Sequence, residues 1–174
     1  MPEFILDTSG QVEAPASVMA KAATQLWPKP LTWVQLDAFT QGYIEALFFT
    51  SEAPGVTSEE WQAAEDHDEG SIPGDVGFAD LAPDALLSIL KDCADFQRAH
   101  AALWADGEAD DDQAGRDFWF TRNRHGVGFW DRDPEMYGCR PFGVSDNNAQ
   151  ALTDAAHACG EVDAYLGDDG KVWL

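Results

Sequence analysis

DFWFTRNRHGVGFWDR, residues 117–132, is the stretch on which the predicted fold depends. Apolar and aromatic side chains alternate in two runs within it, Phe118 to Phe120 and Val127 to Trp130, and alternation with period two is typical of β-strands. The TRNRHG segment between the runs supplies asparagine and glycine, which favour a tight reversal of the chain. The stretch therefore predicts a β-hairpin.

The chain after this hairpin predicts a second one. An alanine-rich helix is expected over residues 145–159, followed by a strand in EVDAYLG, residues 161–167. Asp169 and Gly170 then provide a turn before a short closing strand at residues 171–174.

The chain before the hairpin predicts helices. Apolar spacing and helix-ending prolines indicate helices at residues 16–27, 32–50 and 83–105. Pro83 stands at the first-turn position that proline favours. Residues 51–77 are rich in glycine, proline, serine and acid and predict an acidic surface loop, in which residues 58–66 could form a short capped helix.

These elements predict an α+β fold. The helical N-terminal two-thirds is expected to pack on a small antiparallel β-sheet of three to four strands formed by the two hairpins. A chain of 174 residues fits one domain, residues 1–174. Within it, residues 1–112 form an acidic helical part, and residues 113–174 form the aromatic hairpin and the C-terminal α-β-β part.

The net charge is the most unusual property of the sequence. There are 32 acidic and 10 basic residues, which gives a net charge of −22, and residues 37–112 alone hold nineteen acidic and two basic residues. Nucleic acids and anionic membranes are polyanions that bind clustered lysine and arginine, so direct binding to either is disfavoured. The charge instead favours a basic partner, such as a protein that binds DNA or RNA.

Other composition features predict a cytoplasmic protein without cofactor or metal. No apolar run is long enough for a membrane helix, and MPEFILDTSG at the start lacks the features of a signal peptide. The three cysteines are widely spaced and lack zinc-site spacing, which predicts reduced thiols. The carboxylate runs at residues 65–69 and 108–112 do not match a calcium-binding loop. We expect a monomer or a small homo-oligomer.

The acidic surface admits two interpretations. It could serve solubility alone, or its carboxylates could imitate the phosphate array of a nucleic acid and occupy the basic groove of a protein that binds DNA or RNA. In the second interpretation, the partner-binding residues are Glu59, Glu60, Glu65, Asp66, Asp68, Glu69, Glu108, Asp110, Asp111 and Asp112.

The predicted hairpin offers an alternative site. Arg122 and Arg124 could clamp an anionic substrate while His125 acts as general acid or base and Asp131 orients it. No nucleophile, metal cluster or phosphate-binding loop accompanies them, so no catalytic residue is assigned. The other interpretation is structural, with arginine and aspartate at the hairpin ends forming cross-strand ion pairs.

The hairpin also carries a resemblance. DFWFTRNRHGVGFWDR, followed by LTDAAHACGEVDAYLGDDGKVWL, resembles a family of uncharacterised bacteriophage and prophage proteins with the patterns DFWxTRNxHGxGFWDR and GEVDxYxGDDGK. The resemblance covers roughly the C-terminal 90 residues and, more loosely, YIEALFFTS. Arg124 stands where the family usually has glycine, and residues 133–144 differ from the usual short linker.

The resemblance implies a phage origin and a location in the host-cell cytoplasm. Phages use small acidic proteins to disable host nucleases, CRISPR complexes and repair enzymes. We therefore predict a phage-encoded acidic inhibitor that acts by protein binding, as a nucleic-acid mimic of the anti-CRISPR or antirestriction type, and not by catalysis. Two alternatives remain open: a small enzyme acting on an anionic substrate at the Arg/His hairpin, and an accessory protein that binds a phage replication or virion partner.

Overall fold

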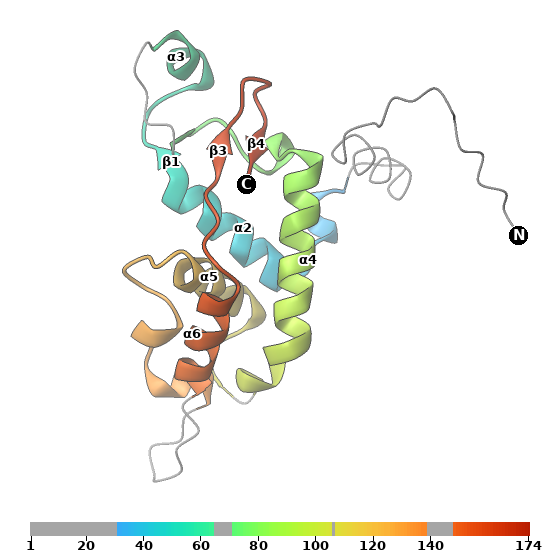
Figure 1. Ribbon diagram of the computed structural model, residues 1–174, viewed down its shortest axis with the longest axis vertical. Coiled ribbons are helices and arrows are strands. Elements are labelled where there is room, and N and C mark those ends of the chain that lie inside the picture. Colours follow the sequence, from blue (N-terminus) through green and yellow to red (C-terminus); the bar gives the residue numbers. More distant parts are fainter. Residues whose placement is uncertain (1–30, 65–70, 106, 139–147) are drawn as a thin grey trace, which may run out of the picture. The chain divides into compact units, whose positions relative to one another are not determined.

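Two helices distant in sequence cross at the centre of the fold. The computed structural model describes residues 31–64, 71–105, 107–138 and 148–174, and α2 (Ala38–Ser51) packs on α5 (Asp111–Arg122) within them (Figure 1). Each helix places a glycine at the crossing. A Cβ atom on Gly42 would overlap the carbonyl oxygen of Asp112, and one on Gly115 would overlap that of Phe39. The backbones therefore approach more closely than any larger residue would allow.

Local signals in the sequence explain where the helices begin. The Asp37 side chain accepts a hydrogen bond from the backbone N–H of Thr40 at 2.9 Å and caps α2. The Asp110 side chain accepts one from Gln113 at 2.8 Å and caps α5. Thr57 and Glu60 form a capping box before α3 (Ser58–Ala63).

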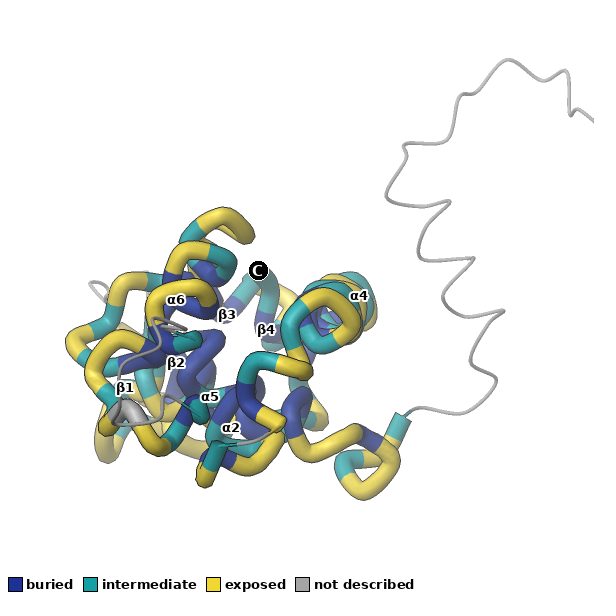
Figure 2. The backbone as a smooth tube through the Cα atoms, turned by 90° about the horizontal axis from the view of Figure 1, so that it is seen from below, coloured by how far each residue is buried: buried dark blue, intermediate teal, exposed yellow. Residues whose placement is uncertain are grey.

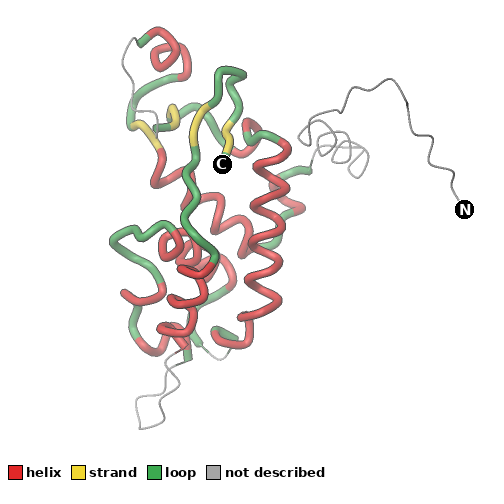
Figure 3. The backbone as a smooth tube through the Cα atoms, viewed as in Figure 1, coloured by secondary structure: helices red, strands yellow, loops and turns green. Residues whose placement is uncertain are grey.

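The remaining elements surround this crossing. Helix α4 (Pro83–His100), with its proline in the first turn, packs on α2, and α6 (Asn148–Ala158) packs on α5 (Figure 3). Short 3-10 turns connect them, at Trp33–Gln35, Phe78–Asp80, Ala101–Leu103, Phe129–Asp131 and Pro134–Tyr137.

Two small sheets complete the described part of the chain. Strands β1 (Glu52–Ala53) and β2 (Ile72–Pro73) pair in parallel, and β3 (Tyr165–Leu166) pairs with β4 (Val172–Trp173) in antiparallel fashion. An isolated bridge joins Val172 to Leu81.

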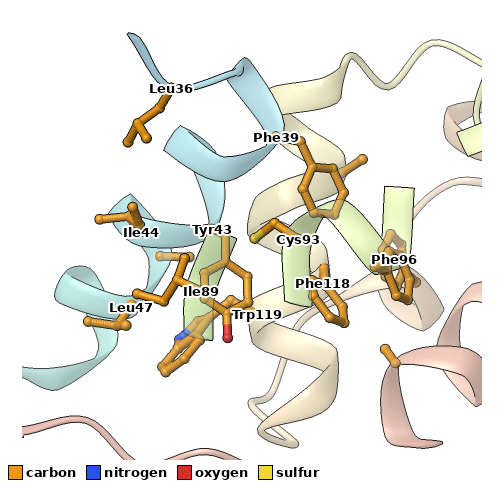
Figure 4. Packing of buried hydrophobic residues seen from close by; sticks show 14 of the residues in the cluster. Leu36, Phe39, Tyr43, Ile44, Leu47, Ile89, Cys93, Phe96, Phe118 and Trp119 are labelled. Atoms are coloured by element: carbon orange, nitrogen blue, oxygen red, sulfur yellow. The ribbon is translucent and has the colours of Figure 1, made fainter. Parts of the chain in front are cut away.

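Aromatic side chains fill the core between α2, α4 and α5. The Phe118 ring lies 4.0 Å from the Phe96 ring, 5.4 Å from the Tyr43 ring and 5.9 Å from the Phe39 ring, centroid to centroid (Figure 4). In Figure 2 the buried backbone gathers where the elements face one another, whereas α4 and α6 carry exposed residues on their outer faces. Aromatic packing of this kind stabilises the fold through the large apolar area that it buries.

The predicted hairpin at residues 117–132 is wrong. Its first half belongs to α5, and its second half contains the 3-10 turn at Phe129–Asp131. Phe118 and Trp119 are adjacent and both buried, a pattern that a helix in a packed core allows and that the alternating faces of a half-exposed strand do not. The decisive helix signals, the Asp110 cap and the acidic first turn, lie upstream of the stretch that suggested strands.

The other predicted elements fare better. The second hairpin is confirmed as β3 and β4. Helix α2 occupies most of the predicted range 32–50 and ends one residue beyond it, and α3, α4 and α6 lie within the predicted ranges 58–66, 83–105 and 145–159. The expected sheet of three to four antiparallel strands is replaced by two separate two-stranded pairs, so the described part is mostly helical with little β-structure. The predicted helix at 16–27 lies outside the described residues. Leu31–Leu174 forms one compact unit.

Candidate functional site

Arg122 is buried at the end of α5, with 2% of its surface exposed. Its Nη1 donates to the Tyr43 hydroxyl at 2.8 Å and to the Asp92 carboxylate at 2.9 Å. Its Nε donates to the carbonyl oxygen of Gly160 at 2.9 Å, and its Nη2 to that of Cys159 at 3.3 Å. Burial raises the pKa of Tyr43, which therefore stays a neutral hydroxyl. Because these protein acceptors engage the guanidinium, Arg122 is not placed to clamp a substrate.

Arg124 and Asp131 lie at the surface. Arg124 has a φ of 56°, the left-handed conformation that glycine adopts without strain. Its Nε pairs with the Glu161 carboxylate at 2.6 Å. Asp131 is exposed on the 3-10 turn, and no hydrogen bond or ion pair among the described residues joins it to His125. The four residues of the alternative site therefore do not form one constellation.

The Asp117–Arg132 pair supports the structural interpretation of this region. The Asp117 carboxylate is completely buried and accepts hydrogen bonds from Arg132 Nη2 at 2.6 Å and from the Tyr137 hydroxyl. Burial raises the pKa of Tyr137, and the adjacent carboxylate raises it further, so this phenol remains a donor. The pair joins α5 to the chain that returns after it, although not across strands as the sequence suggested.

His125 lines a cavity of about 750 Å³. Its ring lies 6.4 Å from the Trp119 ring and 6.1 Å from the Phe120 ring, centroid to centroid. Burial lowers the pKa of His125 below its ordinary value, so the imidazole is neutral at neutral pH. Among the four alternative-site residues, only His125 lines this cavity.

Four segments of the chain build the cavity. They are the end of α2, helix α3, the end of α5 with His125, and residues 162–168, which include β3. In Figure 1 this last segment passes in front of α2. Trp119 Nε1 donates to Thr50 Oγ1 at 2.8 Å, and the Asn123 side chain accepts from the backbone of Val162 at 2.8 Å. These bonds fix the walls. The described lining residues are Thr50, Ser51, Trp61, Trp119, Asn123, His125, Val162, Asp163, Ala164, Tyr165, Leu166, Gly167 and Asp168.

The acidic residues predicted to bind a partner form three groups along the chain. Glu59 and Glu60 are exposed on α3, whereas Glu65, Asp66, Asp68 and Glu69 lie outside the described residues. The third group lies at the start of α5. It holds Glu108, Asp110, Asp111 and Asp112, of which the first three are exposed.

The chain returns to the start of α5 and adds to its acidic surface. The backbone N–H of Glu108 donates to the carbonyl oxygen of Glu135 at 3.2 Å, which brings exposed Glu108 next to exposed Glu135 on the 3-10 turn Pro134–Tyr137. We call Glu108, Asp110, Asp111 and Glu135 the acidic rim. Sequence reasoning missed Glu135 because its approach to Glu108 depends on the tertiary fold.

Every lysine and arginine in the described part of the chain forms an ion pair with a carboxylate. The seven cations are Lys91, Arg98, Arg116, Arg122, Arg124, Arg132 and Lys171. Their partners are seven of the 23 carboxylates in the described residues, so sixteen have no cationic partner there. All four members of the acidic rim are among these sixteen.

Sequence reasoning also missed most of the cavity. Asp163, Tyr165 and Asp168 fall within the GEVDxYxGDDGK pattern, but their distance in sequence from Trp61 and Trp119 hides their proximity in the fold. Trp61 could be singled out only as an aromatic residue able to anchor a partner.

No group of three or more histidine, cysteine, aspartate or glutamate side chains within the described ranges is arranged to hold a metal ion. None of the described helices has the length and apolar character needed to cross a membrane. Comparison with known proteins finds no matching family model, no matching curated protein and no matching solved structure.

Proposed function

We propose that this protein acts by binding a basic, nucleic-acid-binding protein and by competing with nucleic acid for it. The observation that carries the proposal is the complete pairing of the described cations, which leaves sixteen carboxylates without a cationic partner in the same residues. A surface whose positive charges are all engaged presents an almost uniformly negative field, which attracts basic proteins and repels nucleic acid.

The acidic rim supports the proposal because its four carboxylates are exposed and lie close together in the fold. Asp110 and Asp111 are held by the first turn of α5, and Glu108 is joined to Glu135 through the backbone. The cap, the helical turn and this backbone hydrogen bond hold the four residues in place, so binding loses little additional conformational freedom of the chain. Rigid arrays of negative charge are what a groove shaped for phosphates would accept.

The resemblance to bacteriophage proteins supports a more specific form of the proposal. A phage protein in the host cytoplasm encounters host nucleases, restriction enzymes, CRISPR complexes and repair enzymes, all of which carry basic grooves for nucleic acid. An inhibitor of the anti-CRISPR or antirestriction type would occupy such a groove. The charge supports the mode of binding, and the resemblance supports the choice of partner.

Capture from bacterial lysate tests the proposal. The tagged protein should retain a nucleic-acid-binding enzyme at low salt and release it when salt or duplex DNA is added. Salt screens the electrostatic contact, and duplex DNA competes for the same basic groove. The double variant Glu108→Gln with Asp111→Asn should weaken capture. The control double variant, Asp84→Asn with Asp154→Asn, removes the same amount of charge outside the acidic rim and should leave capture unchanged. Capture that survives both salt and DNA would contradict mimicry.

The accessory-protein alternative is distinguished by the same experiment. Phe49, Trp130 and Tyr165 are exposed, and an interface built on them would be predominantly apolar. Such an interface would persist at high salt and, in lysate of phage-infected bacteria, would capture a phage protein in place of a host enzyme. The enzyme alternative loses support because Arg122 is engaged internally and the cavity beside His125 carries carboxylates, which repel an anionic substrate.

A further inference from the structure

We infer that the cavity beside His125 binds a cationic side chain, arginine or lysine, of the partner protein. This inference rests on the proposed function and extends it, because it assigns to the partner a basic residue that inserts into a defined site. The acidic rim would supply the broad electrostatic attraction, and the cavity would supply one anchored contact.

The aromatic lining is suited to a cation. Trp61, Trp119 and Tyr165 line the cavity from three different elements, and Tyr165 is 45% exposed. An ammonium or guanidinium group over an aromatic face is attracted by the negative charge of the π-system, and guanidinium also stacks on it. Hydrogen bonds hold two of the walls in place, from Trp119 to Thr50 and from Trp61 to Ser71 at 3.4 Å. The lining is therefore partly preorganised.

The charged residues of the lining favour a positively charged ligand. Asp163 and Asp168 are exposed, line the cavity and form no ion pair with a described cation. None of the described lining residues is lysine or arginine. The cation closest in sequence, Lys171, pairs with Asp80 at 3.5 Å instead. A cationic ligand would therefore satisfy carboxylates that the described part of the chain leaves uncompensated.

The aromatic walls of the cavity distinguish it from the rest of the acidic surface. Asp163 and Asp168 are exposed like the carboxylates elsewhere on this surface, and an ion pair alone would contribute little because water and salt screen it. In a cavity with aromatic walls, the ligand loses part of its hydration and gains contact area as well as charge compensation. An arginine or lysine stem would also bury its methylene groups against these walls.

Binding of small capped amino acids to the purified protein tests the inference. The probes are N-acetyl-arginine methylamide, its lysine equivalent, and the citrulline equivalent, which keeps the shape of arginine without the charge. Titration is followed through the indole N–H signals of the tryptophans in ¹⁵N-resolved NMR spectra. We expect the two cationic probes to shift the Trp61 and Trp119 signals in a saturable way, with affinity at least about fivefold higher than that of citrulline.

Matched variants separate the cavity from general electrostatics. Asp163→Asn with Asp168→Asn should lower the affinity for the arginine probe by at least about fivefold, and Tyr165→Ala should lower it as well. Asp84→Asn with Asp154→Asn changes the net charge equally and should leave the affinity nearly unchanged. Equal binding of citrulline and arginine, equal loss in both charge variants, or the absence of saturable shifts would each overturn the inference.

The outcomes distinguish this inference from the function on which it rests. Capture of a DNA-displaceable host enzyme without probe binding would leave the proposed function standing and remove the cavity as an anchor. Saturable arginine binding without capture of any basic protein would leave a cation site and contradict the nucleic-acid mimic.

Discussion

Arg122 joins three parts of the chain through one side chain. It reaches Tyr43 on α2, Asp92 on α4 and the carbonyl oxygens that follow α6. A buried charge is tolerated when its donors are satisfied and its counter-ion is close, as they are here. The residue that sequence analysis proposed as a substrate clamp is therefore a structural centre of the fold.

Replacement of Arg122 should destabilise the protein strongly. Arg122→Met leaves the Asp92 carboxylate without its cation and removes the donors to two carbonyl oxygens, so we expect the free energy of unfolding to fall by about 3–5 kcal/mol. Arg124→Met breaks an exposed pair, and the expected loss is at most about 1 kcal/mol. Urea denaturation followed by tryptophan fluorescence measures both. Similar losses for the two variants would contradict the central role of Arg122.

His125 should make the stability depend on pH near neutrality. Burial lowers its pKa in the folded state, so the unfolded chain binds the proton more readily than the folded protein does. The free energy of unfolding is therefore highest at pH values above the ordinary histidine pKa, and it falls as the pH drops through about 6.5. The free energy of unfolding of the wild type should decrease more between pH 7.5 and pH 5.5 than that of His125→Gln. Parallel pH profiles would exclude this contribution.

At the scale of elements, the crossing of α2 and α5 depends on glycine. In an exposed helix, alanine in place of glycine stabilises by roughly 0.5–1 kcal/mol. At position 115 the added Cβ atom would overlap the carbonyl oxygen of Phe39, which belongs to the backbone and cannot rotate away. Helix propensity and tertiary packing therefore act in opposite directions at this residue.

Gly115→Ala should consequently destabilise the protein by about 1–3 kcal/mol despite the better helix propensity of alanine. Gly126→Ala is the matched control, because a Cβ atom there meets nothing within 4 Å. Its expected effect on the free energy of unfolding is within about 0.5 kcal/mol. Thermal unfolding followed by circular dichroism compares the two, and an unchanged midpoint for Gly115→Ala would show that the helices can separate without cost.

The success of sequence analysis differed among elements for identifiable reasons. Helix α4 was predictable because Pro83 marks its start and apolar residues recur along its length. Helix α5 was mistaken for a strand because its three consecutive aromatic residues, 118–120, are too few to distinguish a period of two from one of 3.6. The capping signal at Asp110 was available in the sequence and would have corrected the assignment.

At the scale of the whole molecule, negative charge acts on the protein's own stability. The sixteen carboxylates without a cationic partner in the described residues repel one another, and the eight ion pairs oppose this only locally. The excess of acid was evident from the sequence. Its arrangement was not, because the acidic rim and the cavity join segments that only the tertiary fold brings together.

Salt should therefore stabilise the protein. Between ionic strengths of 0.01 M and 0.15 M the Debye length falls from about 30 Å to about 8 Å, which screens long-range repulsion more than the short ion pairs. We expect the melting temperature to rise over this range in differential scanning calorimetry. A melting temperature that falls with salt would mean that the ion pairs outweigh the repulsion.

The contacts of Val172 affect how the chain can fold during translation. It is completely buried, pairs with Leu166, forms a bridge with Leu81, and its carbonyl oxygen accepts a hydrogen bond from Ala82 at 2.9 Å. During translation the N-terminal parts of a chain emerge first and begin to fold first. Here the start of α4 contacts residue 172, which lies far later in the sequence, so this part of the fold can close only after residue 172 has left the ribosome.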